Sequence, residues 1–355
     1  MSATKGLLPD DRRHLILEYL TENNTARVAD LAERLGVTAV TIRRDLESLS
    51  ETGDVKRIHG GVTLARPFQP AQKPVEYSLG MVVPSLDYYW PSVARGAKDQ
   101  AGRADMKIIL RESAYNSPDQ DRKQIQHLVE HNGVQGLVLT VDVRDSLTLD
   151  LLQELTDQGL AIVLVERNAS LPRDGVPLPA VTSDHRSGAM LAVRTLADLG
   201  HERIAIVAPN NSPTSPHLQS GWEQACQDRN MRPASTWTML VDNSTPETLL
   251  AEVNRVLDIC GAEGITGLLV HADPEANLLV QTAQQRGLVV PGDLSVMAYD
   301  DEVASLFTPA LTAIRPPRYT IGETAVEILV SRLKDPTRPV PRVILSPRLT
   351  IREST

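Results

Sequence analysis

Side chains that can bind or cleave a carbohydrate follow several apolar runs of the chain. These candidate residues are Tyr89, Trp90, Glu166, Arg167, Asp184, Asp273 and Asp300. Aromatic residues make up only 3% of the chain, yet three of them stand in a row from Tyr88 to Trp90. An aromatic ring covers the C–H face of a sugar, while carboxylates and arginine bond its hydroxyl groups. The same carboxylates could instead act as the acid and base of a glycosidase.

The sequence offers few of the other groups that catalysis uses. Only two cysteines occur, Cys226 and Cys260, and neither belongs to a CxxC pair or to a Cys/His cluster spaced for zinc. The chain also lacks a nucleophile motif and a phosphate-binding loop. We therefore expect a binding protein with no cofactor and no metal, not an enzyme. A carbohydrate-active enzyme is the weaker alternative.

The candidate residues need elements that bring them together, and the chain after residue 76 has a suitable pattern. Short apolar runs alternate with helical segments, at residues 79–83, 107–110, 136–139, 161–165, 203–208, 267–270 and 294–298. Strands that alternate with helices predict an α/β fold with parallel, doubly wound sheets. Ligands of such sheets bind beyond the carboxyl ends of the strands, where most of the candidate residues stand.

A different pattern occupies the first 64 residues. The spacing of apolar residues predicts three helices, one near residues 10–21, one at 28–35 and one that begins after Thr38. Residues 55–58 and 62–64 predict two short strands joined by a tight turn. Helices joined by a short glycine-containing turn and followed by a hairpin are typical of a winged helix-turn-helix domain.

The third helix and the hairpin carry side chains suited to DNA. These are Thr38, Thr41, Arg43, Arg44, Arg57 and His59. Hydroxyl groups and arginines near the start of a recognition helix meet phosphates and the edges of guanine. The alternative is that Arg43 and Arg44 only form helix-surface pairs with Glu47 and Asp45. Lys56 and Arg57 in the hairpin favour the interpretation as a DNA-binding face.

One stretch of this region resembles a known family. The run from Thr41 to Leu46 (TIRRDL), followed by Gly53, Arg57 and the triplet His59-Gly60-Gly61, is similar to the DeoR-type winged helix of bacterial regulators. The resemblance covers residues 10–65. It implies that Thr38, Thr41, Arg43 and Arg44 contact operator DNA, with Arg57 and His59 near the DNA backbone. Thr38 replaces the serine usual in the family and keeps the hydroxyl group.

The larger part resembles the effector domain of LacI/GalR-type regulators, which is similar to periplasmic sugar-binding proteins. The resemblance rests on several runs: Val163 to Arg167, Leu199 to Ile204, Gly221-Trp222, Val290 to Val296, Tyr299 to Asp301 and Leu311 to Ile314. It implies two subdomains that close on a ligand. The positions that match ligand contacts are Trp90, Arg167, Asp184, Asp273 and Asp300. Leu218 and Ala272 replace polar residues of the family, and His185 replaces a common asparagine, so the family's well-known sugars do not transfer directly.

These patterns predict the domain organisation. We expect a winged helix-turn-helix domain at 1–64, a Pro-rich linker at 65–76 and an effector-binding and dimerisation domain at 77–355. The two lobes of the last are expected at 77–182, together with C-terminal crossover segments, and at 183–298. The net charge is −9, but residues 1–62 hold nine Lys and Arg against ten Asp and Glu, so the acidity belongs to the rest of the chain. DNA binding therefore needs a local basic face.

The order of these domains predicts a sequence-specific transcription regulator. We expect a homodimeric repressor of carbohydrate-utilisation genes that leaves operator DNA when a small sugar binds. An activator, or a regulator that needs its ligand as co-repressor, has the same build and stays an alternative. No apolar run reaches 18 residues and the N-terminus has no secretory pattern, which predicts a cytoplasmic protein without membrane contact.

Overall fold

The computed structural model describes residues 9–58, 61–65, 77–231, 238–242 and 244–355. The chain divides into two compact units, Met1–Glu76 and Tyr77–Thr355. Most of the expected linker, residues 66–76, lies outside the described residues, as do His59 and Gly60.

The first unit contains the three expected helices and the expected hairpin. Its elements are α1 (Pro9–Asn23), β1 (Thr25–Ala26), α2 (Val28–Leu35), α3 (Ala39–Glu51), β2 (Val55–Ile58) and β3 (Gly61–Leu64). Gly36 ends α2 with a left-handed φ of 65°, as the sequence predicts. The strand order is β1-β3-β2, because the two-residue β1 adds a third strand that the sequence analysis did not foresee. Leu31, Ile42 and Leu46 belong to the core beneath this sheet.

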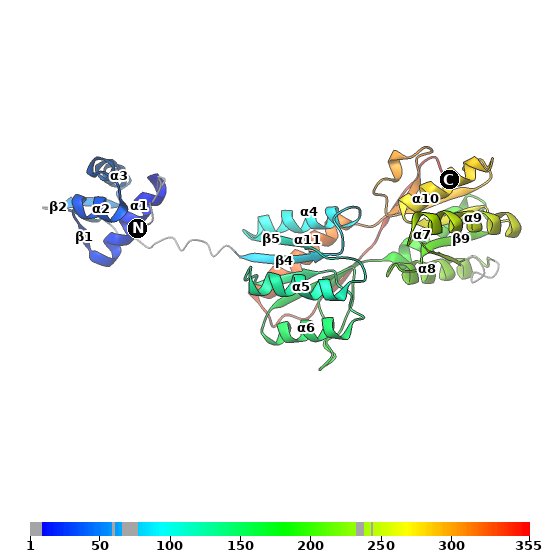
Figure 1. Cartoon of the computed structure of the whole chain (residues 1–355), viewed down its shortest axis with the longest axis horizontal. Helices are drawn as coiled ribbons and strands as arrows, with labels where there is room; N and C mark the ends of the chain where they lie inside the picture. The colour runs from blue at the N-terminus through cyan, green and yellow to red at the C-terminus, as the bar shows by residue number, and fades with distance from the viewer. Residues whose placement is uncertain (1–8, 59–60, 66–76, 232–237, 243) are drawn as a thin grey trace. The chain divides into compact units, whose positions relative to one another are not determined.

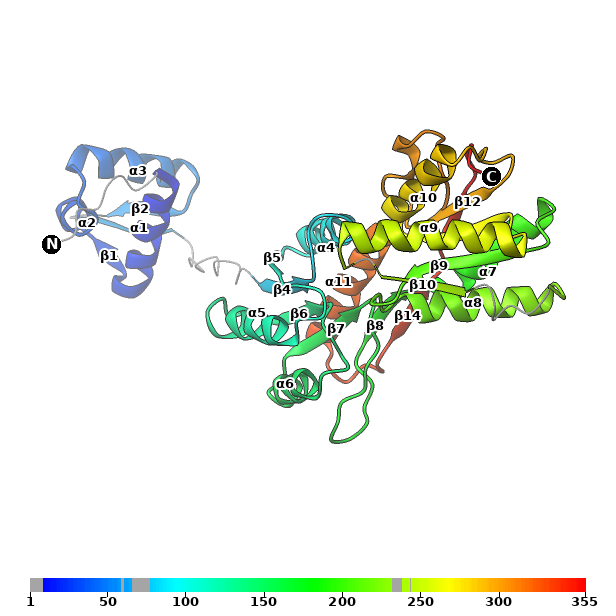
Figure 2. The ribbon, with the colours of Figure 1, turned by 45° about the vertical axis from the view of Figure 1, so that its right-hand side comes forward.

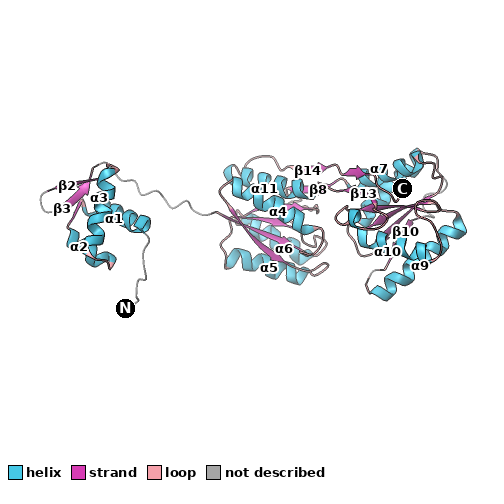
Figure 3. Cartoon of the chain, turned by 90° about the horizontal axis from the view of Figure 1, so that it is seen from above, coloured by secondary structure: helices cyan, strands magenta, loops and turns pink. Residues whose placement is uncertain are grey.

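The second unit consists of two α/β lobes, both visible in Figure 1 and Figure 3. Lobe 1 contains β4 (Ser78–Val83), α4 (Trp90–Arg103), β5 (Lys107–Glu112), α5 (Pro118–Glu130), β6 (Gly136–Leu139), α6 (Ser146–Asp157), β7 (Ala161–Val165), β8 (Ala180–Ser183), α11 (Arg318–Lys334) and β14 (Arg342–Leu345). Its sheet has the order β14-β8-β7-β6-β4-β5, and all of its pairs are parallel. Helices α4 and α11 cover one face, and α5 and α6 cover the other (Figure 1).

Helices α4 and α11 lie unusually close together. A side-chain carbon at Gly96 would overlap the backbone oxygen of Tyr319, and one at Gly322 would overlap that of Val93. Glycine at these two positions therefore allows the backbones of the helices to touch.

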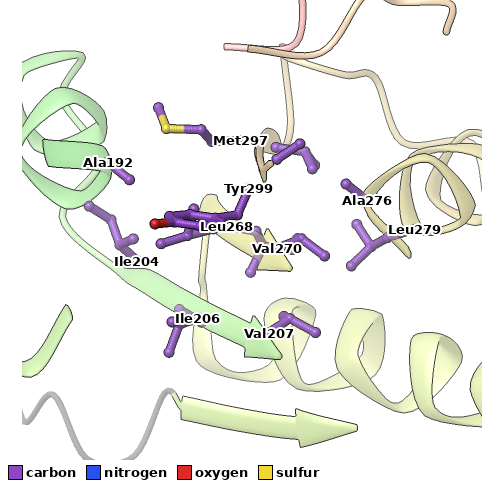
Figure 4. Close-up of a cluster of buried hydrophobic side chains, with 14 of the residues drawn as sticks. Ala192, Ile204, Ile206, Val207, Leu268, Val270, Ala276, Leu279, Met297 and Tyr299 are labelled. Carbon is purple, nitrogen blue, oxygen red and sulfur yellow. The ribbon is translucent and has the colours of Figure 1, made fainter. Parts of the chain in front are cut away.

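Lobe 2 contains α7 (His185–Asp198), β9 (Ile204–Pro209), α8 (Ser215–Asp228), β10 (Thr238–Val241), α9 (Pro246–Glu263), β11 (Gly267–His271), α10 (Asp273–Gln285), β12 (Ser295–Tyr299), the 3-10 turn η2 (Ala304–Leu306), β13 (Thr312–Arg315) and β15 (Arg348–Thr350). The order of its strands is β10-β9-β11-β12-β13-β15, and only the β13–β15 pair is antiparallel. Its helices form two pairs, α7 with α8 and α9 with α10 (Figure 2). Figure 4 shows part of the core, where Ile206, Leu268 and Tyr299 project among apolar side chains of the flanking helices.

The chain passes between the lobes three times. It crosses after β8 into α7, after β13 into α11 and after β14 into β15. Lobe 2 therefore extends beyond the expected end at residue 298, since β13 and β15 complete its sheet. The structure confirms the predicted parallel sheets and all seven predicted strands to within two residues at each end.

Strand order places a ligand crevice in each lobe. In lobe 1, β5 and β6 flank β4 on opposite sides, and in lobe 2, β10 and β11 flank β9 in the same way. The order of the strands reverses at these points, where the loops after neighbouring strands diverge. The loops that follow β4, β6, β9 and β11 are therefore those that should hold a ligand.

Candidate functional site

The start of α3 is an exposed polar face. Thr38, Arg43 and Arg44 are exposed and Thr41 is half-buried, while Ile42 on the opposite side is fully buried. The Oγ1 atom of Thr38 accepts a hydrogen bond from the amide of Thr41 at 3.2 Å, which makes Thr38 the helix N-cap that the sequence predicts.

The contacts of Asp45 bear on the alternative role of the two arginines. Arg12 of α1 binds both carboxylate oxygens of Asp45, with distances of 2.5 and 3.0 Å, and both side chains are buried. Asp45 is therefore part of the contact between α1 and α3 and not a surface partner of Arg44. Among the described residues, Arg43 and Arg44 form no ion pair. Arg57 is exposed on β2, and His59 lies outside the described residues.

The second unit contains two adjoining cavities between its lobes. The aromatic chamber has a volume of about 570 Å³, and Tyr88, Tyr89, Trp90, Ser212, His271 and Asp300 are among its lining residues. The polar chamber has a volume of about 450 Å³, and Asp142, Arg144, Asn168, Asp184, Arg186 and His217 are among its lining residues. Both chambers are walled by the loops at the two strand-order reversals.

Four aromatic residues line the aromatic chamber: Tyr88, Tyr89, Trp90 and Tyr115. Trp90 begins α4, and its Nε1–H donates a hydrogen bond to the hydroxyl of Tyr115 at 2.7 Å. This bond orients Tyr115, whose surface is 51% exposed. Tyr89 meets Trp90 edge-on, with ring centroids 5.1 Å apart. The chamber therefore combines aromatic rings with polar groups, the mixture that suits a sugar.

Glu166 joins hydrogen bonds within lobe 1 to a contact with lobe 2. Its carboxylate accepts bonds from the hydroxyl of Tyr89 at 2.7 Å and from the amide and hydroxyl of Ser183 at 2.9 and 2.7 Å. Nε2 of His185, the first residue of α7 in lobe 2, lies 3.3 Å from the same carboxylate. Burial by itself would raise the pKa of Glu166, but His185 and these hydrogen bonds lower it to about 2. Glu166 is therefore a charged acceptor.

His271 and Asp300 approach each other at the carboxyl ends of β11 and β12. Nε2 of His271 lies 3.7 Å from the Asp300 carboxylate, and Nδ1 of His271 is buried without a hydrogen-bond partner among the described residues. Burial lowers the pKa of His271 to about 3, and burial together with the charge of Asp273 raises that of Asp300 well above its ordinary value. His271 is therefore a buried neutral ring at the edge of the chamber.

Arg318 holds the turn that follows β12. Its guanidinium donates to the backbone oxygens of Asp300 and Asp301 and pairs with Glu302. The same guanidinium lies 5.4 Å from the centre of the Tyr89 ring. Because Arg318 begins α11 in lobe 1, it fixes the Asp300 side of the chamber relative to the Tyr89 side.

Asp273 is a correction to the expected ligand contacts. Its carboxylate is fully buried, lines neither chamber, and accepts four backbone N–H bonds of 2.7–3.1 Å from residues 301–304. These bonds anchor the turn after β12 to the start of α10. Asp273 therefore has a structural role, and a ligand cannot reach its oxygens.

The other expected residues lie at the chambers. Trp90, Tyr89 and Asp300 line the aromatic chamber, Asp184 lines the polar chamber, and Arg167 lines both. Asp184 is also the N-cap of α7, since it accepts a bond from the amide of Ser187 at 2.9 Å. Leu218, where the family often has arginine, is buried in the core and contributes no polar group.

Several lining residues were not among the candidates from the sequence. These include Tyr115, Asn116, Ser212, Thr214, His217 and His271. His271 directly follows the predicted strand at 267–270, and residues 210–214 follow the one at 203–208, so the strand-end rule could have found both. Tyr115 stands three residues beyond β5, and no spacing indicates that its loop folds over Trp90.

The described residues contain no cluster of three or more His, Cys, Asp or Glu side chains able to hold a metal ion. Cys226 and Cys260 are buried free thiols. None of the helices in the described part of the chain is long and apolar enough to cross a membrane.

Comparisons with known proteins match both units. The DeoR-like helix-turn-helix domain matches residues 12–68, and the periplasmic binding protein-like domain matches residues 193–355. Among curated relatives, a regulator named MalR from Streptomyces coelicolor is 26% identical over 93% of this chain and 97% of its own length. The arabinose metabolism transcriptional repressor of Geobacillus stearothermophilus is 26% identical over 92% of this chain and 90% of its own.

Solved structures show the same fold. A transcriptional regulator CelR in complex with cellobiose superposes with a TM-score of 0.67, at 21% identity, over 90% of this chain and 92% of that one. A LacI-family regulator from Enterococcus faecium with bound ribose gives a TM-score of 0.64, at 23% identity, over 78% of this chain and 98% of that one. With both units and their arrangement along the chain accounted for, this protein is an HTH-type transcriptional regulator that joins a DeoR-like helix-turn-helix head to a periplasmic binding protein-like effector domain with the LacI-family fold.

Proposed function

We propose that this chain represses carbohydrate-utilisation genes in the cytoplasm and leaves its operator when a small sugar binds between lobes 1 and 2. The observation that carries the proposal is the pairing, in one chain, of an exposed arginine face on α3 with an aromatic and polar cleft. The relatives named for arabinose metabolism and the neighbours solved with cellobiose and ribose support a sugar as the effector.

The proposed DNA contacts are Thr38, Thr41, Arg43 and Arg44, with Arg57 and His59 near the DNA backbone. Two recognition helices bound about one helical turn apart, roughly 34 Å, multiply the modest affinity of one. We therefore propose a homodimer that forms through the effector domain.

Closure of the lobes on the sugar transmits the signal. Rotation about the three crossovers changes how the two heads are spaced, and coupling of this kind is typically about 1 to 3 kcal/mol. The carboxylates of the cleft act as hydrogen-bond acceptors; the bonds that Glu166 accepts from Tyr89 and Ser183 support this role.

The test combines operator selection with effector release. The full-length protein is mixed with random DNA duplexes, the bound duplexes are sequenced, and the enriched sequence is used in band shifts with a panel of sugars. We expect one sequence to be enriched and at least one sugar to weaken its binding. A sugar that strengthens binding supports the co-repressor alternative, and no preference over random duplex contradicts the proposal.

A further inference from the structure

The two chambers of the cleft share one wall. The residues common to both are Tyr115, Asn116, Glu166, Arg167, His185, Pro213 and Thr214. Each chamber alone, at about 450 and 570 Å³, lies within the range of roughly 300–1,000 Å³ that holds a drug-sized ligand. A single sugar ring in one chamber would therefore leave the other chamber to water.

Arg167 stands at the junction with its donors available. One Nη1–H bonds the backbone oxygen of Glu166 at 2.7 Å, and among the described residues the guanidinium forms no ion pair. A guanidinium has five N–H donors, so most of them can reach oxygens of a ligand that passes from one chamber to the other. Burial lowers the pKa of Arg167 by more than the nearby charges of Glu166 and Asp142 raise it, so these carboxylates offset its removal from water only in part.

The charges of the polar chamber favour a neutral, hydroxyl-rich group. Its carboxylates already have partners in the protein: Asp142 pairs with Arg144 at 2.7 Å, and Asp184 caps α7. Acidic residues outnumber arginines along its wall, so a phosphate or a carboxylate would meet no excess of positive charge. Asn168 and His217 add donors and acceptors that suit hydroxyl groups.

From these observations we propose that the effector is a neutral ligand of two linked sugar rings. One ring lies against Trp90 and Tyr115 in the aromatic chamber, the second occupies the polar chamber, and the linkage passes Arg167. The inference rests on the proposed function, because it specifies the effector of the same cleft.

Two bulky substitutions test the chambers one at a time. His217→Trp adds volume at an exposed position that lines only the polar chamber, and Asn211→Trp does so at one that lines only the aromatic chamber. Gln227→Trp is the matched control, since Gln227 is exposed on α8 with His217 and lines neither chamber.

The experiment is calorimetric titration of the full-length protein and these variants with glucose, galactose, arabinose and ribose, and with disaccharides and trisaccharides of the hexoses. We expect one disaccharide to bind at least tenfold more tightly than its component monosaccharide, and the matching trisaccharide to add less than threefold. His217→Trp should remove the gain from the second ring and leave monosaccharide affinity unchanged. Asn211→Trp should weaken both ligands, and Gln227→Trp neither.

The outcomes distinguish this inference from the proposed function. Tightest binding by a monosaccharide, or an unchanged disaccharide affinity in His217→Trp, overturns the two-ring assignment and leaves a sugar-responsive regulator intact. If no saccharide in the panel binds, the sugar effector itself is wrong, and the two-ring assignment falls with it.

Discussion

Nε2 of His185 lies 3.3 Å from Oε2 of Glu166, and this contact spans the first crossover between the lobes. Glu166 follows β7 in lobe 1, whereas His185 begins α7 in lobe 2. Rotation of one lobe against the other must change this distance. Both residues also line both chambers, so a ligand would compete with this contact between the lobes for the same polar atoms.

Removing the charge of Glu166 should destabilise the effector domain. Its pKa of about 2 is depressed from 4.5, and a shift of this size corresponds to about 3 kcal/mol of stability. This stability is present above pH 4.5 and is lost as the pH falls toward 2. Glu166→Gln should therefore unfold at lower urea than wild type at pH 7, with a smaller difference at pH 3. Tryptophan fluorescence reports this unfolding, since all three tryptophans follow residue 76.

The control for Glu166→Gln is Asp228→Asn, which removes an exposed surface pair with Arg194. Such a pair contributes little, on the order of 0 to 1 kcal/mol. An equal loss of unfolding free energy in the two variants would contradict the assigned role of Glu166.

His271 should make the effector domain less stable in acid. Its pKa of about 3 in the folded chain lies below the ordinary 6.5, so the unfolded chain takes up the proton first as the pH drops. The contribution is present above pH 6.5 and falls by about 1.4 kcal/mol for each pH unit below it. Between pH 7 and 5, the free energy of unfolding of His271→Gln should therefore fall by about 2 kcal/mol less than that of wild type. Urea titrations at both pH values give the free energy of unfolding of each protein. An equal loss of stability in wild type and variant would show that His271 is not buried as a neutral ring.

Tyr115 should contribute to ligand binding more than to folding. Because its ring is half exposed and lines both chambers, Tyr115→Ala should lower effector affinity at least tenfold and change the melting temperature little. Trp90→Phe is the comparison, since it removes the bond to the Tyr115 hydroxyl but keeps an aromatic ring. An effector affinity unchanged in Tyr115→Ala would place the ligand elsewhere in the cleft.

Arg43 and Arg44 should be required for DNA binding only. Loss of an arginine contact to a base or phosphate costs about 1 to 3 kcal/mol, so Arg43→Ala and Arg44→Ala should each weaken operator binding roughly tenfold or more. Glu47→Gln, an exposed change on the same helix, should not weaken it. Fluorescence anisotropy with the selected operator gives the affinities. Wild-type affinity in both arginine variants would show that α3 is not the recognition helix.

The sequence predicted the central strands and the three helices of the head because their apolar residues recur without interruption. It did not predict the short strands β8, β10, β13, β14 and β15, which lie toward the edges of the sheets or near the crossovers and mix polar with apolar residues. Pairing with neighbouring strands of the same sheet, not local pattern, decides their structure.

The candidate site, like the fold, was predictable only in part. Trp90 and Arg167 were candidates because they stand beyond buried strands, and both line the chambers. Asp273 also follows one, yet its carboxylate faces the turn after β12, where Asp300 and Asp301 have positive φ values of 113° and 54°. A turn of this kind directs amide groups toward Asp273, and spacing along the chain does not reveal it.

The four amide bonds to Asp273 have a consequence for how the specificity of this protein can evolve. They fix the main chain at one side of the cleft before any sugar arrives, so little ordering entropy is lost when the sugar binds there. Exchange of a single side chain on this rigid border would therefore alter which metabolite is detected without rebuilding the loop. Related regulators with the same carboxylate at this position should differ in their inducers through neighbouring side chains while their backbones superpose.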